Sequence, residues 1–243
     1  MTDYCLSDVH LRPDDPALTA ALLSFIARRH SGERCFILGD LFDLWAGDDI
    51  GCADFPAVLA GLRTATQAGV AIGFMPGNHD FLVRSRFLLD SGCVLLPDPF
   101  VTVLAGRRAV LTHGDQLCTL DVAYQRFRAQ VRSPGWQQQV LAKPIAQRRA
   151  LADELQQGST QAKQDKSLDE MDAQPDACTA LLREHRATLL VHGHTHRPGV
   201  HELPQAEPAM RAVLGYWRQQ PLVLAAGNAA WQLEQPAGTP AAI

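Results

Sequence analysis

The sequence lacks the features that mark several common protein classes. Its 243 residues contain no apolar run long enough to span a membrane, and the acidic start MTDYCLSDVH does not resemble a secretory signal peptide. Its six cysteines include no CxxC pair, which argues against a zinc ribbon and against a disulfide scaffold. We therefore expect a soluble, cytoplasmic protein with buried free thiols.

An excess of basic charge is also lacking. The 22 Lys and Arg residues are outnumbered by 26 Asp and Glu, so the formal net charge is −4. Domains that bind nucleic acid are usually strongly basic, so we expect no nucleic-acid partner. Hydrophobic residues make up 47% of the chain, enough to bury a large core. We therefore expect one domain over residues 1–243 that carries an insertion.

Short apolar runs that end in polar residues recur along the chain. They are YCLSD, CFILGD, VAIGFMPGN, AVLTHGD and TLLVHGH, and each is typical of a buried strand followed by a loop. Stretches with helical spacing, about 16–29 and 54–68, separate the first three runs. This alternation predicts an α/β fold with its functional site at the strand ends. Near the end of the chain, VHEL, AMRAVLG, PLVLAAG and AAWQLEQ predict antiparallel strands.

Residues 117–185 differ in composition and predict a helical cap. They are rich in Ala, Gln, Arg and Leu, which favour helices. Within this segment, residues 122–152 contain six basic side chains and no acidic one: Arg126, Arg128, Arg132, Lys143, Arg148 and Arg149. Apolar side chains lie among them, so one interpretation is a surface that contacts an anionic membrane. The alternative is a solvated basic helix face packed on the core.

Side chains able to bind metal follow five of the apolar runs. They are Asp8 with His10, Asp40, Asn78, His113, and His194 with His196. A carboxylate such as Asp40 can bridge two cations, and amide oxygens and imidazoles complete a mixed ligand set. Each motif alone has an ordinary structural interpretation as a helix cap, a turn or a core residue. For His192 we keep the interpretation as a core residue. Their succession in this order indicates a metal site.

The succession D-x-H, GD, GNH, HG and GHTH resembles the calcineurin-like metallophosphoesterase superfamily over most of the chain. The resemblance implies a β-sandwich flanked by helices, here with the helical cap. It also implies two divalent metal ions, with Mn²⁺ as our first choice. One ion would be held by Asp8, His10, Asp40 and His196, and the other by Asp40, Asn78, His113 and His194.

The resemblance further implies how the reaction would run. A water activated by the two metals would attack phosphorus in line, with Asp40 as the bridging ligand. His79 would donate to a phosphoryl oxygen or to the leaving oxygen, although an exposed loop histidine is the alternative. Asp43, Asp48 and Asp49 either orient the ligands or cap the following helix.

Longer strings are similar to a narrower group, the UDP-2,3-diacylglucosamine hydrolases of the lipid A pathway. They include SDVHL, ILGDLFDLWAGDD, PGNHDFL, KSLDEMD and HGHTHRPGVHEL, and the similarity spans nearly the whole chain. It implies attack on the α-phosphorus of UDP-2,3-diacylglucosamine, which releases UMP and a lipid phosphate. It places the chain on the cytoplasmic face of the inner membrane of a Gram-negative bacterium. The implied substrate contacts are Asn78, His79, Asp121, Tyr124, Ser159, Lys163, Lys166 and His194.

Two positions depart from that group. His79 stands where its members commonly carry Arg, and Gln156 lies near the place of another Arg, so contacts to the diphosphate would differ. Two other hypotheses stay open. One is a soluble nucleotide phosphohydrolase with the same metals, against which the basic, aromatic-bearing cap argues. The other is a non-catalytic scaffold, against which the complete ligand set argues.

Overall fold

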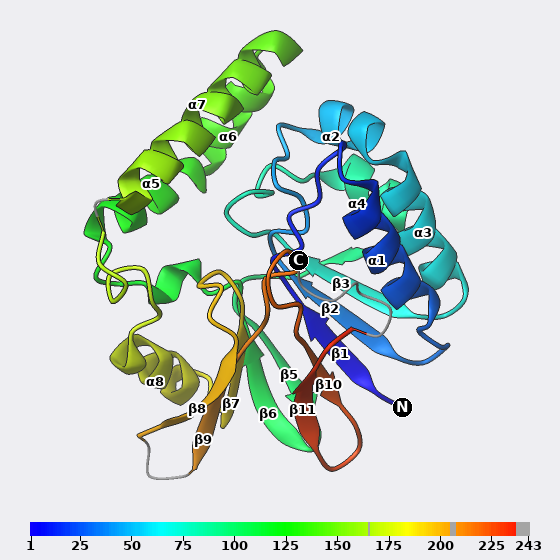
Figure 1. Cartoon of the computed structure of the whole chain (residues 1–243), viewed down its shortest axis with the longest axis vertical. Coiled ribbons are helices and arrows are strands. Elements are labelled where there is room, and N and C mark those ends of the chain that lie inside the picture. The colour runs from blue at the N-terminus through cyan, green and yellow to red at the C-terminus, as the bar shows by residue number, and fades with distance from the viewer. Residues whose placement is uncertain (165, 205–207, 237–243) are drawn as a thin grey trace.

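Two β-sheets form the framework of the computed structural model, which describes residues 1–164, 166–204 and 208–236. The six-stranded sheet has the order β11-β10-β1-β2-β3-β4, and the five-stranded sheet has the order β5-β6-β7-β9-β8. Both sheets mix parallel and antiparallel pairs. Helices lie on the outer faces of the two sheets (Figure 1). This layered arrangement confirms the predicted α/β sandwich.

The first sheet contains the strands expected from the first three apolar runs. Its members are β1 (Asp3–Leu6), β2 (Arg34–Leu38), β3 (Ala71–Met75), β4 (Val94–Leu95), β10 (Val223–Ala226) and β11 (Trp231–Glu234). Strands β1, β2 and β3 are parallel neighbours, so their carboxyl ends meet at one edge of the sheet. Helices α1 (Pro16–Ala27), α2 (Asp48–Asp54), α3 (Pro56–Gln67) and α4 (Ser85–Ser91) connect them. The predicted alternation of strand and helix is confirmed.

Local sequence explains why α1 begins where it does. The side chain of Asp15 accepts a hydrogen bond from the backbone N–H of Leu18 at 3.0 Å, and Pro16 is the first helical residue. Phe25 and Ile26 of α1 are buried against the sheet in the core that also contains Ile37 of β2. The helix is thereby held on the outer face of the first sheet.

The second sheet receives the later apolar runs. Its strands are β5 (Phe100–Leu104), β6 (Arg107–Leu111), β7 (Leu189–His192), β8 (Gly199–Leu203) and β9 (Ala209–Val213). All four segments predicted to be strands at the end of the chain form strands. Antiparallel pairing holds for β8 with β9 and for β10 with β11, but β9 also pairs in parallel with β7. The side chains of Leu38, Met75, Leu111 and Val191 pack between the two sheets.

The cap segment is helical. It contains α5 (Val122–Val131), α6 (Pro134–Leu141), α7 (Ile145–Gln164) and α8 (Pro175–Glu184), preceded by a short 3-10 helix, η1 (Asp115–Leu117). Figure 1 shows α5, α6 and α7 grouped above one end of the sandwich, whereas α8 lies against the second sheet. Cys178 and Leu182 of α8 are buried in a core with Val110 and Leu190. In the described part of the chain, no helix is long and apolar enough to cross a bilayer.

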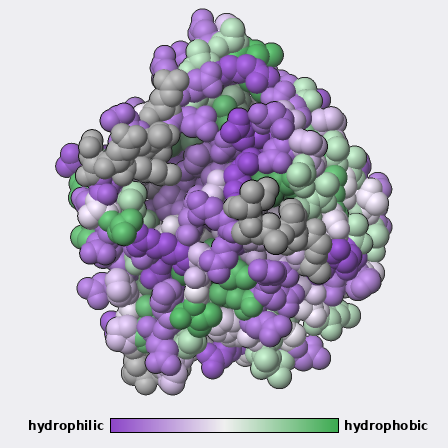
Figure 2. All heavy atoms as spheres, in the orientation of Figure 1, coloured by the Kyte–Doolittle hydropathy of each residue, from purple (hydrophilic) through white to green (hydrophobic). Residues whose placement is uncertain are grey.

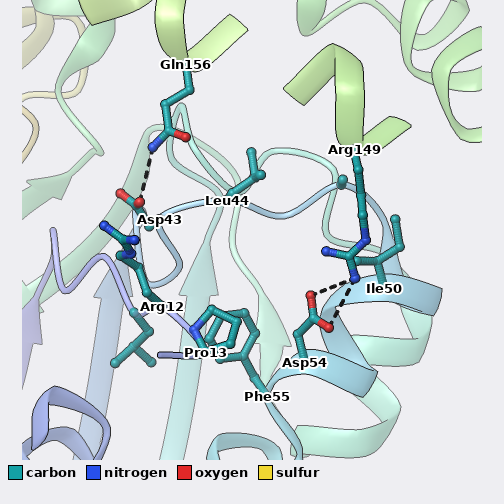
Figure 3. Close-up of a pocket in the computed structure, with 11 residues that line it drawn as sticks. Arg12, Pro13, Asp43, Leu44, Ile50, Asp54, Phe55, Arg149 and Gln156 are labelled. Carbon is teal, nitrogen blue, oxygen red and sulfur yellow. Dashed lines mark hydrogen bonds and ion pairs between the residues drawn. The ribbon is translucent and has the colours of Figure 1, made fainter. Parts of the chain in front are cut away.

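Four of the six basic side chains in residues 122–152 pair with carboxylates of the protein itself. Arg128 and Arg132 both bond to the buried Asp115, at 2.8 and 3.4 Å. Arg148 bonds to Asp49 and to the carbonyl of Ala46. Arg149 bonds to Asp54 at 3.1 Å, as Figure 3 shows. These four side chains therefore pair within the protein, although Arg149 stays exposed. Arg126 and Lys143 remain exposed on the cap.

The Arg148 contact predicts an effect on stability. Arg148 is only 4% exposed, so Arg148→Gln leaves Asp49 and the Ala46 carbonyl without their charged donor. We expect the free energy of unfolding to fall by about 1–2 kcal/mol in urea denaturation followed by circular dichroism. Arg126→Gln, on the exposed face of α5, is the matched control and should change it by less than about 0.5 kcal/mol. Equal stability of Arg148→Gln and the parent would contradict this role.

Candidate active site

The predicted metal ligands lie in loops that follow the strands of the two sheets, and five of them share an unusual backbone conformation. Asp8, His10, Asp40, His194 and His196 all have a positive φ, between +51° and +66°. Residues other than glycine seldom adopt this region, and the strain concentrates at functional sites. These five residues therefore form strained turns at the ends of the strands.

The first group of side chains surrounds Asp8. The Nε2 atom of His196 lies 3.4 Å from Asp8 Oδ1, and Nε2 of His10 lies 3.9 Å from the same oxygen. His10 Nε2 also lies 3.5 Å from Asp40 Oδ2, so it connects this group to the second one. One donor atom from each of Asp8, His10 and His196 fits within 4.8 Å of the others.

The second group surrounds the other side of Asp40. His113 Nε2 lies 3.6 Å from Asp40 Oδ2, and donor atoms of Asp40, His113 and His194 again lie within 4.8 Å of one another. The amide oxygen of Asn78 lies 2.9 Å from His113 Nε2 and 2.8 Å from His194 Nδ1. Asp40 therefore stands between the two groups. Through these contacts all seven predicted side chains form one cluster, which we call the metal cluster.

Hydrogen bonds at the far ring nitrogens orient two of the imidazoles. His10 Nδ1 lies 3.2 Å from Asp43 Oδ1, and His113 Nδ1 donates to the carbonyl of Leu38 at 2.9 Å. Metal-binding histidines commonly have a hydrogen bond of this kind at the ring nitrogen that does not bind the metal. In both rings it leaves Nε2 facing Asp40. The buried Nε2 of His10 has no hydrogen-bond partner among the described residues. These donors, four imidazoles with two carboxylates and one amide, fit divalent metal ions.

The electrostatics of the cluster favour positive charge at its centre. Burial would raise the pKa of Asp40, but the imidazoles of His113, His79 and His10 outweigh burial and hold that pKa well below its usual range. Burial would lower the pKa of His113, but the nearby carboxylates, Asp40 first among them, raise it to about 9. The carboxylates thus draw positive charge to the position where cations would bind.

Two glycines of the motifs are needed because the backbone comes very close to the carboxylates. A Cβ atom at Gly77 would collide with the carboxylate of Asp40, and one at Gly193 would collide with the carboxylate of Asp8. Any larger residue would push these side chains out of place. The GN and HGH motifs therefore need glycine for steric reasons.

Sequence reasoning missed the role of Asp80. Its carboxylate is fully buried and accepts hydrogen bonds from the backbone N–H groups of Gly77 at 2.7 Å, Leu41 at 2.8 Å and Asp40 at 3.3 Å. It therefore links the loop after β2 to the loop after β3. Burial, together with the charge of Asp40, raises the pKa of Asp80 to about 6. Its position directly after Asn78 and His79 was the available signal.

Tyr216 was also missed. Its ring stacks on the ring of His196, with centroids 4.2 Å apart and planes at 12°, and meets His10 edge-on at 5.4 Å. Tyr216 follows β9 in the chain, far from every metal motif. No local pattern in the sequence distinguishes it.

His79 lies at the edge of the metal cluster. Its Nδ1 donates to the carbonyl of Asp43 at 2.8 Å, and its Nε2 lies 4.0 Å from Asp40 Oδ2. Asp43 itself orients His10. Asp48 instead caps α4 by accepting from the backbone N–H groups of its first turn, and Asp49 pairs with the cap. Of the two predicted roles, orienting a ligand therefore applies to Asp43, whereas neither Asp48 nor Asp49 caps α2, the helix that begins at Asp48.

Of the predicted substrate contacts on the cap, Tyr124 lies against the metal cluster, whereas Asp121 and Lys166 pair with each other. The ring of Tyr124 stacks on His194 at 5.7 Å, and its hydroxyl donates to Asp115 at 2.9 Å. Asp121 caps α5 and forms an ion pair with Lys166 at 2.5 Å. The side chains of two further predicted contacts on α7, Ser159 and Lys163, lie outside the described part of the structure.

His192 is a core residue, as expected. It is fully buried, and its Nε2 accepts a hydrogen bond from Nε of Arg211 at 2.8 Å. Burial and the charge of Arg211 lower the pKa of His192 to about 3, which keeps the ring neutral. It bonds to Arg211 although two members of the metal cluster, His194 and His196, follow it closely in the sequence.

Comparison with known proteins identifies the class. Residues 1–198 match the family described as calcineurin-like phosphoesterase, and this chain belongs to that family. It is therefore a metal-dependent hydrolase. Among its relatives, UDP-2,3-diacylglucosamine hydrolase of Chromohalobacter salexigens is 43% identical over 90% of this chain and 89% of its own length. The proteins of that name from Cellvibrio japonicus and Escherichia coli are 44% and 41% identical, over 90% of this chain and 92% of theirs.

Proposed function

We propose that this protein hydrolyses the pyrophosphate bond of UDP-2,3-diacylglucosamine to UMP and 2,3-diacylglucosamine 1-phosphate in lipid A biosynthesis. The observation that carries the proposal is the metal cluster, complete in a chain at least 41% identical, over nine-tenths of its length, to hydrolases of that name. A scaffold protein would have no need for strained turns around a full ligand set.

The metal cluster would hold two divalent ions with Asp40 between them. Asp8, His10, Asp40 and His196 would bind one ion, and Asp40, Asn78, His113 and His194 the other. The mixed oxygen and imidazole donors suit Mn²⁺, Fe or Zn²⁺, and the resemblance to the superfamily makes Mn²⁺ our first choice. When bound, two such ions supply a nucleophilic hydroxide at neutral pH and neutralise charge on the phosphoryl oxygens.

His79 would act on the phosphoryl or leaving oxygen. Because its Nδ1–H is used by the carbonyl of Asp43, its Nε2 is the nitrogen left facing Asp40 and the substrate. In the imidazolium form, Nε2–H donates a hydrogen bond to oxygen that gains negative charge in the transition state. Asn78 and His194 would touch the same phosphate from the opposite side of the cluster.

The cap offers aromatic surface for the acyl chains. Phe81, two residues after His79, packs against Trp136 of α6 at 6.0 Å, and Tyr124 lies near Phe127 of α5 at 6.5 Å. Tyr124 also stacks on His194 of the metal cluster, so the lipid half of the substrate would lie along these rings. The sugar would contact the polar cap residues, which we take to be Asp121, Ser159, Lys163 and Lys166.

We further propose that the protein works in the cytoplasm at the surface of the inner membrane of a Gram-negative bacterium. Leu120, Val122, Phe127 and Leu168 are exposed apolar side chains of the cap, with Arg126 among them. Apolar side chains beside a cation suit contact with an anionic lipid surface. By contrast, the face of the molecule between cap and sandwich is mainly hydrophilic in the view of Figure 2.

Release of UMP from UDP-2,3-diacylglucosamine in mixed micelles with Mn²⁺ tests the function. We expect rapid release, near-complete loss after chelation by EDTA, and recovery when Mn²⁺ is restored. UDP-N-acetylglucosamine, which lacks the acyl chains, should react far more slowly. Slow release from the lipid with faster turnover of water-soluble dinucleotides would instead favour a soluble nucleotide phosphohydrolase.

A further inference from the structure

A cavity of about 220 Å³ lies between helix α7 of the cap and the core, beside the metal cluster (Figure 3). Its apolar wall is formed by Leu44, Ile50 and Phe55. Its polar wall carries two arginines, Arg12 and Arg149, together with Asp43, Asp54 and Gln156. The lining therefore offers both flat apolar contacts and hydrogen-bonding groups. None of the roles described above uses this space.

One carboxylate contacts both the cavity and the metal cluster. Asp43 Oδ1 lies 3.2 Å from Nδ1 of the cluster residue His10, and Asp43 Oδ2 accepts from the amide of Gln156 at 3.2 Å. Asp43 therefore lies at the border between the cavity and the metal cluster, where a group attached to a phosphate at the cluster would enter the cavity. Figure 3 shows Gln156 reaching down from α7 to Asp43 at this border.

The polar wall is held in place before any ligand binds. Arg149 bonds to both carboxylate oxygens of Asp54, at 3.1 and 3.2 Å, across the junction of α7 with α2. Gln156 on the same helix is oriented by Asp43. A wall that is already ordered lowers the entropy cost of binding.

We propose that this cavity is the subsite for the nucleoside half of the substrate, the uracil and ribose of a uridine nucleotide. The inference rests on the proposed function, in which a diphosphate joins an apolar lipid half to a polar nucleoside half. The metal cluster has two unlike borders. On one side, Phe81 follows His79 by two residues and packs against Trp136, and these rings suit acyl chains. On the other side, the polar wall of this cavity would be costly to desolvate against a hydrocarbon.

The chemistry of the cavity matches a pyrimidine nucleoside. Apolar side chains such as Phe55 and Ile50 contact the faces of a planar ring, and the amide of Gln156 pairs with its polar edge. The guanidinium groups of Arg12 and Arg149 are donors for the carbonyl oxygens of uracil or for the ribose hydroxyls. A small, half-polar cavity of this kind selects a nucleoside over an acyl chain.

Binding of UMP, compared with ribose 5-phosphate, tests the subsite by isothermal titration of the Mn²⁺-loaded protein. The two ligands share phosphate and sugar, so their affinity ratio reports contacts to the base alone. We expect UMP to bind at least tenfold more tightly. Gln156→Ala, which removes the amide, and Leu44→Trp, which fills the cavity, should bring the ratio close to one. Gln147→Ala, an exposed glutamine on the same helix, should keep the ratio of the parent.

The outcomes separate the subsite from the proposed function. A ratio near one in the parent, or an unchanged ratio in Gln156→Ala, would overturn the subsite even if the lipid substrate is hydrolysed. A strong preference for UMP that both variants abolish would support the subsite even if UDP-2,3-diacylglucosamine is not turned over. That result would contradict only the proposed identity of the lipid half of the substrate.

Discussion

Asp40→Ala should lower the rate of UMP release by roughly 10³-fold or more. Asp40 stands between the two groups of the metal cluster, with imidazole nitrogens of His10 and His113 3.5 and 3.6 Å from its Oδ2. Its loss removes the ligand that both ions would share. Metal content measured by mass spectrometry should fall together with the rate, while circular dichroism shows that the fold survives.

The control for this variant is Asp176→Ala, which removes an exposed carboxylate from the first turn of α8. It should keep both the metal content and the rate of the parent. Full activity and two bound ions in Asp40→Ala would show that the cluster is not the catalytic centre. Asp40→Asn keeps the shape of the side chain and should lose metal almost as completely, because the negative charge is the feature that matters.

His79→Ala should reduce kcat by about 10²–10³-fold with little change in KM. The expected size reflects the loss of one charged donor at an oxygen that becomes negative in the transition state. His79 is not among the seven ligands, so its variant should still bind two metal ions. This retained metal content distinguishes the His79 effect from the Asp40 effect.

Two further variants sharpen the His79 test. His79→Arg restores a cationic donor and should recover a substantial part of kcat, whereas His201→Ala, at an exposed position on β8, should behave as the parent. An undiminished kcat in His79→Ala would assign this histidine to the loop structure alone. A loss of metal in the same variant would instead make it a ligand.

The positions of the strands along the chain and the identity of the clustered side chains were accessible from the sequence. Apolar runs of this length, bounded by polar loop residues, are too short for a typical helix and pair their backbone groups in a sheet instead. Asp8, Asp40 and Asn78 follow β1, β2 and β3, and parallel strands bring their carboxyl ends to the same edge. A pattern of this kind needs no knowledge of distant contacts, so motif reasoning succeeded there.

The environment of the basic cap residues could not be derived in that way. Arg149 meets Asp54 from 95 positions away, and Gln156 meets Asp43 from 113 positions away. Composition identified a basic segment but could not show that Arg148 is buried against Asp49. Such pairing depends on where the chain returns, which the packing of whole elements decides.

The sequence by itself determined the chemistry of this protein: seven metal-competent side chains at strand ends, and the glycines that let them approach. The tertiary structure alone decided how that chemistry is supported, through the Asp80 carboxylate beneath the loops and the Tyr216 ring against His196. It also decided that α7 lines one side of a cavity beside the cluster. The physical reason is that local backbone preferences extend over a few residues, whereas burial and ion pairing are settled only when distant segments pack together.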